Sequence, residues 1–193
     1  MARPWDPKEY ARLSRTSIDE GTLVLQNISF KVGDVRATYQ FALESPANSE
    51  RTSYDDEFIS VSLYPAETQL GFVLRNRSSE PIKVLWDQCA YVDPLGQSLR
   101  VIHSGIRMIQ KDAAMSPSVV PPGASLKEAM TPADYITYVG GEAGWSVRQM
   151  FPTRFVQALP LKGIAISIFM PIEIKGSPHN YTFTLRAKDI IPD

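Results

Sequence analysis

The sequence is poor in the residues that most often build metal and redox sites. Its 193 residues include one cysteine, Cys89, and two histidines, His103 and His179. A single cysteine excludes an intrachain disulfide and any metal cage built from several thiolates. Two histidines far apart in the sequence form no multi-histidine ligand pattern. The sequence therefore predicts no metal site and no bound cofactor.

An excess of one charge sign and long apolar runs are also missing. The 20 Lys and Arg residues against 21 Asp and Glu give a net charge of -1, and no run of four basic residues occurs. Such a balance does not attract nucleic acid, so nucleic-acid binding is not expected. The longest apolar strip, residues 164–172, is too short to span a bilayer, and no apolar signal segment follows Met1. We expect no transmembrane segment in this chain.

Familiar catalytic signatures are not found. The motifs GxxxxGK[ST], GxGxxG and GxSxG do not occur. His103 and Ser104 are adjacent, but neighbours on a strand point to opposite faces, which disfavours a nucleophile–base pair. Cys89 lies in a strand-like run, where a lone cysteine is usually a core residue. We therefore expect no catalytic residues, and keep a hydrolase centred on His103 as a remote alternative.

What the sequence does have is a repeated two-residue periodicity between turn signals. Apolar and polar residues alternate in most of the expected strands, and Gly, Pro and Asp residues lie between them. These strands are 22–30, 35–43, 58–65, 68–76, 82–92, 97–103, 163–174 and 180–187. No alternation of strands with helices is visible. The pattern predicts an all-β, antiparallel, immunoglobulin-like β-sandwich of seven or eight strands.

Two short helices are expected beside these strands. Asp6-Pro7 suits the start of a helix over 7–15, and a capping pattern from Thr131 predicts another over 132–139. No internal repeat or low-complexity tract divides the remainder. We therefore expect an N-terminal arm with a short helix, residues 1–20, followed by one β-sandwich domain, residues 21–193.

The segment 82–92 contains an irregularity. Its apolar residues occupy even positions up to Trp86 and odd positions from Cys89 onward. Because side chains on a strand alternate with a period of two, this change of phase predicts one of two structures. Either a β-bulge lies near Asp87, or the strand is buried on both faces.

The middle of the chain, about residues 70–135, carries a recognisable set of turn and core residues. They are Asn76, Ser78, Pro81, Ile82, Trp86, Asp87, Tyr91, Asp93, Gly96, Ser98, Arg100, His103, Gly105, Pro121, Pro122, Gly123, Pro132, Ala133 and Asp134. With these residues the chain resembles a broad group of uncharacterised bacterial cell-envelope proteins, many of them lipoproteins, with an immunoglobulin-like sandwich. The resemblance implies a domain in the periplasm or cell envelope and carries over no catalytic residues. Because the chain shows no signal peptide or N-terminal lipid-bearing cysteine, a cytoplasmic location is the alternative.

Large apolar residues gather in segment 145–155, which has no clear periodicity. Exposed patches of this kind often mark interfaces, so we expect a partner interface there, extended by the N-terminal arm. The candidate interface residues are Trp5, Trp145, Met150, Phe151 and Phe155. The alternative is that the segment folds back and caps an open end of the sandwich.

These observations favour a non-enzymatic protein that acts through its surface. We expect an accessory or structural subunit, or a protein-interaction module, of an envelope- or membrane-associated assembly with protein partners. The alternative is a small-molecule or carbohydrate-binding β-sandwich module that uses tyrosines on a sheet face or loop rim. The tyrosines considered for this role are Tyr39, Tyr54, Tyr64, Tyr135 and Tyr138.

Overall fold

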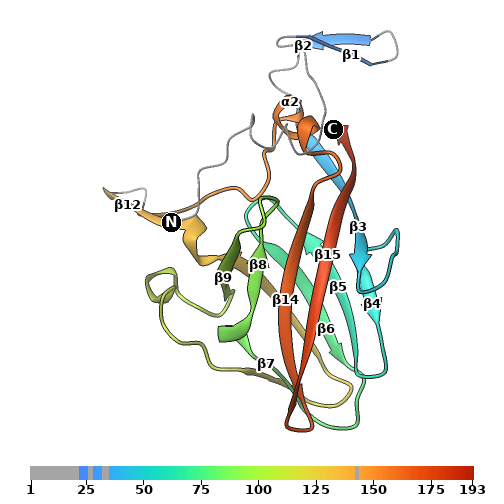
Figure 1. The fold of residues 1–193 in the computed structure, drawn as a ribbon. Helices are drawn as coiled ribbons and strands as arrows, with labels where there is room; N and C mark the ends of the chain where they lie inside the picture. The colour runs from blue at the N-terminus through green and yellow to red at the C-terminus, as the bar shows by residue number, and fades with distance from the viewer. Residues whose placement is uncertain (1–21, 26–27, 32–34, 142–143) are drawn as a thin grey trace.

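The computed structural model describes residues 22–25, 28–31, 35–141 and 144–193, and its regular secondary structure is almost entirely β-strand (Figure 1). Every strand pairing within these residues is antiparallel. The strands form one 11-stranded sheet and two 2-stranded sheets. The prediction of an all-β, antiparallel fold is confirmed, whereas the expected number of seven or eight strands is too small. The proposed division at residue 20 lies at the edge of the described residues and stays a prediction.

The main sheet runs in the order β10-β7-β14-β8-β9-β11-β6-β5-β4, with β15 added to β14 and β3 added to β15. Its strands are β3 (Ala37–Ser45), β4 (Ser53–Asp55), β5 (Ile59–Pro65), β6 (Leu70–Asn76), β7 (Ile82–Val84), β8 (Ala90–Val92), β9 (Ser98–His103), β10 (Ser118–Val120), β11 (Ser125–Pro132), β14 (Ala165–Ile174) and β15 (Ser177–Pro192). The small sheets are β1 (Thr22–Leu25) with β2 (Ile28–Lys31), and β12 (Ile136–Gly140) with β13 (Gly144–Val147).

Helical structure in the described residues is limited to single turns. The described chain contains the 3₁₀ turns η1 (Trp86–Gln88), η2 (Met108–Gln110), η3 (Ala133–Tyr135) and η5 (Leu159–Leu161), and the α-helical turn α2 (Phe155–Ala158). No helix in this part of the chain has the length and apolarity to cross a membrane. The helix expected over 7–15 lies outside the described residues.

The hairpin of β14 and β15 is the longest paired element. Its ladder runs from Ala165 opposite Arg186 to Ile174 opposite Ser177, so Lys175 and Gly176 form a two-residue turn. Both turn residues have positive φ, 52° and 76°, which is the conformation that matches the twist of a two-residue hairpin. The alternating apolar residues of both strands are buried, as their periodicity predicts.

The core lies between this hairpin and the strands behind it. In Figure 1, β14 and β15 run along the near side, and β5 and β6 lie behind them. Buried residues of both layers belong to one hydrophobic cluster. The edges at β3 and β4 also approach each other, because Leu43 bridges to Ser49 and its N–H donates to the Arg51 carbonyl at 3.1 Å. The sheet therefore curls most of the way around its core.

Several segments differ from the sequence predictions, and β10, β11 and β13 lie where no strand was expected. Residues 22–30 are not one strand, because Leu25 pairs with Ile28 in the β1–β2 hairpin. Residues 44–57, which lie between two expected strands and were not expected to form one, contain the short strand β4. Residues 132–139 form η3 and then β12 rather than a helix. Isoleucine, threonine, tyrosine and valine at 136–139 favour a strand once β13 is available as a partner.

The turn η1 explains the change of phase in segment 82–92. Both β7 and β8 pair with β14, with Val84 opposite Ile172 and Ala90 opposite Phe169. Five residues, 85–89, therefore face only two residues of β14, 170 and 171, which leaves an excess of three. An odd excess exchanges the two faces of the strand, because the side-chain period is two. The interruption near Asp87 is confirmed, but a 3₁₀ turn causes it rather than a simple bulge.

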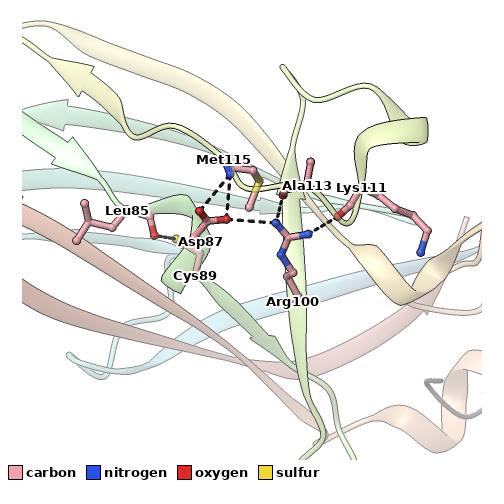
Figure 2. Close-up of polar contacts among 7 residues, drawn as sticks. All are labelled: Leu85, Asp87, Cys89, Arg100, Lys111, Ala113 and Met115. Atoms are coloured by element: carbon pink, nitrogen blue, oxygen red, sulfur yellow. Dashed lines mark hydrogen bonds and ion pairs between the residues drawn. The ribbon is translucent and has the colours of Figure 1, made fainter.

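The side chains of η1 hold the long loop 104–117. The indole of Trp86 is fully buried, stacks on the imidazole of His103 with ring centres 4.4 Å apart, and donates from Nε1 to Ser118 Oγ at 2.8 Å. The Asp87 carboxylate accepts the Met115 N–H at 3.0 and 3.1 Å on its two oxygens (Figure 2). The loop is thus attached to η1 where it returns to the sheet.

Arg100 of β9 completes this attachment. Its guanidinium contacts Asp87 Oδ1 at 3.2 Å and donates to the carbonyl oxygens of Lys111 and Ala113 (Figure 2). One arginine therefore satisfies two loop carbonyls and one carboxylate, and the loop backbone needs no regular secondary structure to be held in place.

We expect Asp87→Ala to lower the free energy of unfolding by about 1–3 kcal/mol, because the buried Met115 N–H loses its acceptor. The partly exposed ion pair with Arg100 adds little to this loss. Urea denaturation measures the change. Asp112→Ala, at an exposed carboxylate of the same loop, is the matched control and should change stability by less than about 0.5 kcal/mol. Equal effects at both positions would contradict the assignment.

Candidate functional site

The hairpin of β12 and β13 forms a sheet of its own and projects from the body of the protein (Figure 1). Its register places Ile136 opposite Val147, Thr137 opposite Ser146 and Tyr138 opposite Trp145. Gly140 and Gly144, near the turn, both have positive φ, a conformation that glycine adopts without a steric penalty. The hairpin therefore has a base next to the body and a tip away from it.

The base of the hairpin is fastened to the core. Tyr135 and Ile136 are buried, and the Arg148 guanidinium lies over the Tyr135 ring at 3.8 Å. The backbone N–H of Arg148 donates to the Tyr135 carbonyl at 2.8 Å, and the backbone N–H of Met150 donates to the Glu67 carbonyl at 2.6 Å. These contacts fix the direction in which the hairpin leaves the body.

The tip of the hairpin carries large apolar side chains in water. Tyr138 is 61% exposed, Val139 56% and Trp145 36%. The rings of Tyr138 and Trp145 lie across the two strands with centres 5.2 Å apart at 57°. We call these three residues the hairpin patch. None of these three side chains is charged, and Val139 lies where the register of the hairpin shifts between Tyr138 and Gly140.

The residues of the expected interface do not lie together in the structure. Trp145 belongs to the hairpin patch, and Trp5 lies outside the described residues. Met150, Phe151 and Phe155 are buried in the hydrophobic core, so these three side chains form no surface patch. The chain turns back at the base of β13, as in the alternative in which the segment caps the sandwich, and the apolar side chains beyond it enter the core.

Phe151 shows this burial most directly. Its ring lies 5.3 Å from that of Tyr39 and 5.2 Å from that of Phe41, both on β3. Substitution of Phe151 therefore tests the core rather than an interface. Tyr138 was expected only as a candidate ligand-binding tyrosine, and Val139 was not expected at a binding surface, because the capping pattern predicts a helix over 132–139. The signal that could have identified them is the strand-forming run 136–139 directly before Gly140-Gly141.

His103 lies near a carboxylate and a hydroxyl, but in an order that does not activate a nucleophile. The Ser104 hydroxyl donates to Glu128 Oε2, and the Glu128 Oε1 atom is 3.6 Å from His103 Nδ1. His103 Nδ1 also accepts the Gly105 N–H at 3.2 Å. A catalytic triad needs the imidazole between hydroxyl and carboxylate, whereas here the carboxylate is in the middle. The arrangement joins β9 to β11.

Cys89 is a core residue rather than a reactive thiol. Its side chain is buried, and Sγ lies 3.5 Å from the Leu85 carbonyl (Figure 2). Burial raises the pKa of the Cys89 thiol to about 12. The nucleophilic thiolate is therefore scarce at neutral pH. Among the residues that the structure describes, no three or more His, Cys, Asp or Glu side chains gather as a metal site would require.

We expect native Cys89 to resist Ellman's reagent at mildly alkaline pH and to react fully once urea unfolds the chain. The raised pKa keeps the thiol protonated, and burial excludes the reagent. The same protein in urea is the control, because it has the same thiol in water. Native labelling as fast as labelling in urea would contradict the buried position.

Comparison with known proteins assigns this chain to no family. No protein-family model matches the sequence, and a search of curated proteins finds no match. Among solved structures, a Bacillus subtilis protein described as a "putative lipoprotein" aligns with 11% identity and a TM-score of 0.42. The alignment covers 72% of this chain and 39% of that one, so the chain spans about two fifths of its neighbour's length. A similarity of this size does not establish a common fold.

Proposed function

We propose that this protein is a non-enzymatic interaction module, an accessory or structural subunit of an envelope-associated assembly. In this proposal it binds a protein partner through the hairpin patch, residues Tyr138, Val139 and Trp145. The observation that carries the proposal is an exposed, uncharged aromatic surface on a hairpin whose base is fixed in the core. Tyrosine and tryptophan are the residues that most often dominate binding energy at protein interfaces.

The exposed face and the unpaired edge of the β12–β13 hairpin favour binding of a partner protein. A two-stranded hairpin is marginally stable in water unless something covers its apolar face. Within the described residues, β12 pairs with β13 alone, so one edge of β12 keeps unpaired backbone groups. Natural proteins usually protect such edges with charge or proline, and residues 136–139 contain neither. An apolar strand or groove of a partner protein would complete both the face and the edge.

The scaffold in this proposal is an immunoglobulin-like sandwich located in the periplasm or cell envelope. The resemblance in residues 70–135 supports this location. Several of its residues have structural roles: Asn76 Nδ2 donates to the Glu80 and Val120 carbonyls at 2.7 and 2.9 Å, and Asp93 Oδ1 accepts two N–H groups of the turn before β9. These residues shape the scaffold and leave binding to the surface.

A photo-crosslinking amino acid at position 139 tests the proposal in the cells that produce the protein. We expect it to form a discrete crosslink to a second protein. Val119 on β10 is the matched control, because it is also a strand valine, 58% exposed against 56% for Val139, and it should give no such product.

Trp145→Ser should lower the yield of the crosslink at position 139 by at least about tenfold. It should change the free energy of unfolding by less than about 0.5 kcal/mol. The side chain is exposed, so its loss removes little core packing. Crosslinking of the same protein at both valines, or none at position 139, would refute the hairpin patch as a binding surface.

A further inference from the structure

The outer face of strands β5, β6 and β11 carries a second surface feature. Across these strands Gly71 lies between Tyr64 and Ala129, and in the next row Val73 lies between Ser62 and Lys127. A glycine and an alanine therefore occupy adjacent positions beside a tyrosine. Because side chains on one sheet face stand side by side, the two small residues leave a hollow next to the large tyrosine ring.

The hollow is a groove of about 600 Å³. Tyr64, which is 55% exposed, forms one wall, Gly71 and Ala129 contribute to the floor, and Ser104 and Glu128 lie on the opposite side. Gln69 and Lys127 complete the rim. This volume falls within the range of about 300–1,000 Å³ that is usual for small-molecule sites.

The polar groups of the groove are of mixed type, and some are fixed in position. The Ala129 N–H donates to Ser104 Oγ at 3.0 Å, and Ser104 N and its hydroxyl both bond to Glu128 Oε2. Gln69 offers a donor and an acceptor, Lys127 offers a donor, and the Glu128 carboxylate accepts from Ser104 and lies 3.6 Å from His103 Nδ1. The groove thus combines an aromatic wall with donors and acceptors whose formal charges cancel.

We propose that this groove binds a neutral saccharide of a few sugar units. A pyranose ring has an apolar C–H face that can pack on Tyr64, and hydroxyl groups that can bond to both donors and acceptors on the rim. A phosphate or sulfate ligand would require a net positive lining, whereas the lining has one lysine and one glutamate, whose formal charges sum to zero. Addition of a peptide strand is excluded at the floor, because β6 is already paired with β5 and β11.

Isothermal titration of the full chain with cellohexaose, hexa-N-acetylchitohexaose and maltohexaose tests the proposal, and the three probes distinguish glucan from N-acetylated ligands. We expect saturable binding of at least one of them. Tyr64→Ala should weaken that binding by about tenfold or more, because the stacking wall is lost.

Gly71→Val should abolish binding by filling the floor. A Cβ at Gly71 would meet Tyr64 O at 3.5 Å and Tyr64 Cβ at 3.6 Å, which are ordinary contacts, and Val73 on the same face shows that the strand accommodates valine. The variant should therefore fold, as thermal unfolding would verify. Val119→Ala, at an exposed residue of β10 outside both the groove and the hairpin patch, is the control and should leave saccharide binding unchanged.

Absence of saturable binding to all three oligosaccharides would overturn the proposal. Binding that survives both Tyr64→Ala and Gly71→Val would overturn it as well, because the ligand would then lie elsewhere. Neither result affects the hairpin patch, since the groove lies on β5, β6 and β11 and the patch on β12 and β13.

Discussion

The arrangement of the protein depends on one mismatch in strand length. β14 is continuous, whereas the chain that pairs with it across β7 and β8 contains three more residues than the ladder can hold. The excess forms η1, which buries Trp86 in the core and turns Asp87 outward to the loop 104–117. An even excess would have kept the apolar residues of β7 and β8 in phase. The odd number thus determines which residues face the core and which hold the loop.

The residues that anchor the two proposed binding surfaces differ from the residues that are exposed on them. Tyr135, Ile136 and Met150 fasten the β12–β13 hairpin, while the hairpin patch meets water beyond them. On the sheet itself, burial of Leu63 and Phe72 on the inner face leaves Tyr64 and Gly71 on the outer face to shape the groove. In both places a well-packed layer fixes the geometry of side chains that do not contribute to the core, as preorganised binding requires.

The sequence predicts best where one physical signal acts alone. Clean alternation located β3, β5, β6, β14 and β15, and the phase change near Asp87 located η1, although not its 3₁₀ geometry. The β12–β13 hairpin was missed because the capping pattern at Thr131 and the strand-forming run 136–139 give opposite signals, and cross-strand pairing decides between them. The groove could not be predicted, because it depends on register: Gly71 is informative only once it lies between Tyr64 and Ala129.

The positions of two tryptophans give the protein two separate optical reporters. Trp86 is enclosed and stacked on an imidazole, so its emission should be blue-shifted in the native state and move to longer wavelength on unfolding. Trp145 stands in water at the hairpin patch, so its emission responds to whatever covers that patch. Because Trp5 also emits, replacing both Trp5 and one of these two indoles by phenylalanine isolates the signal of the other. The fold thus contains, without any added dye, the means to follow its own unfolding and its own association independently.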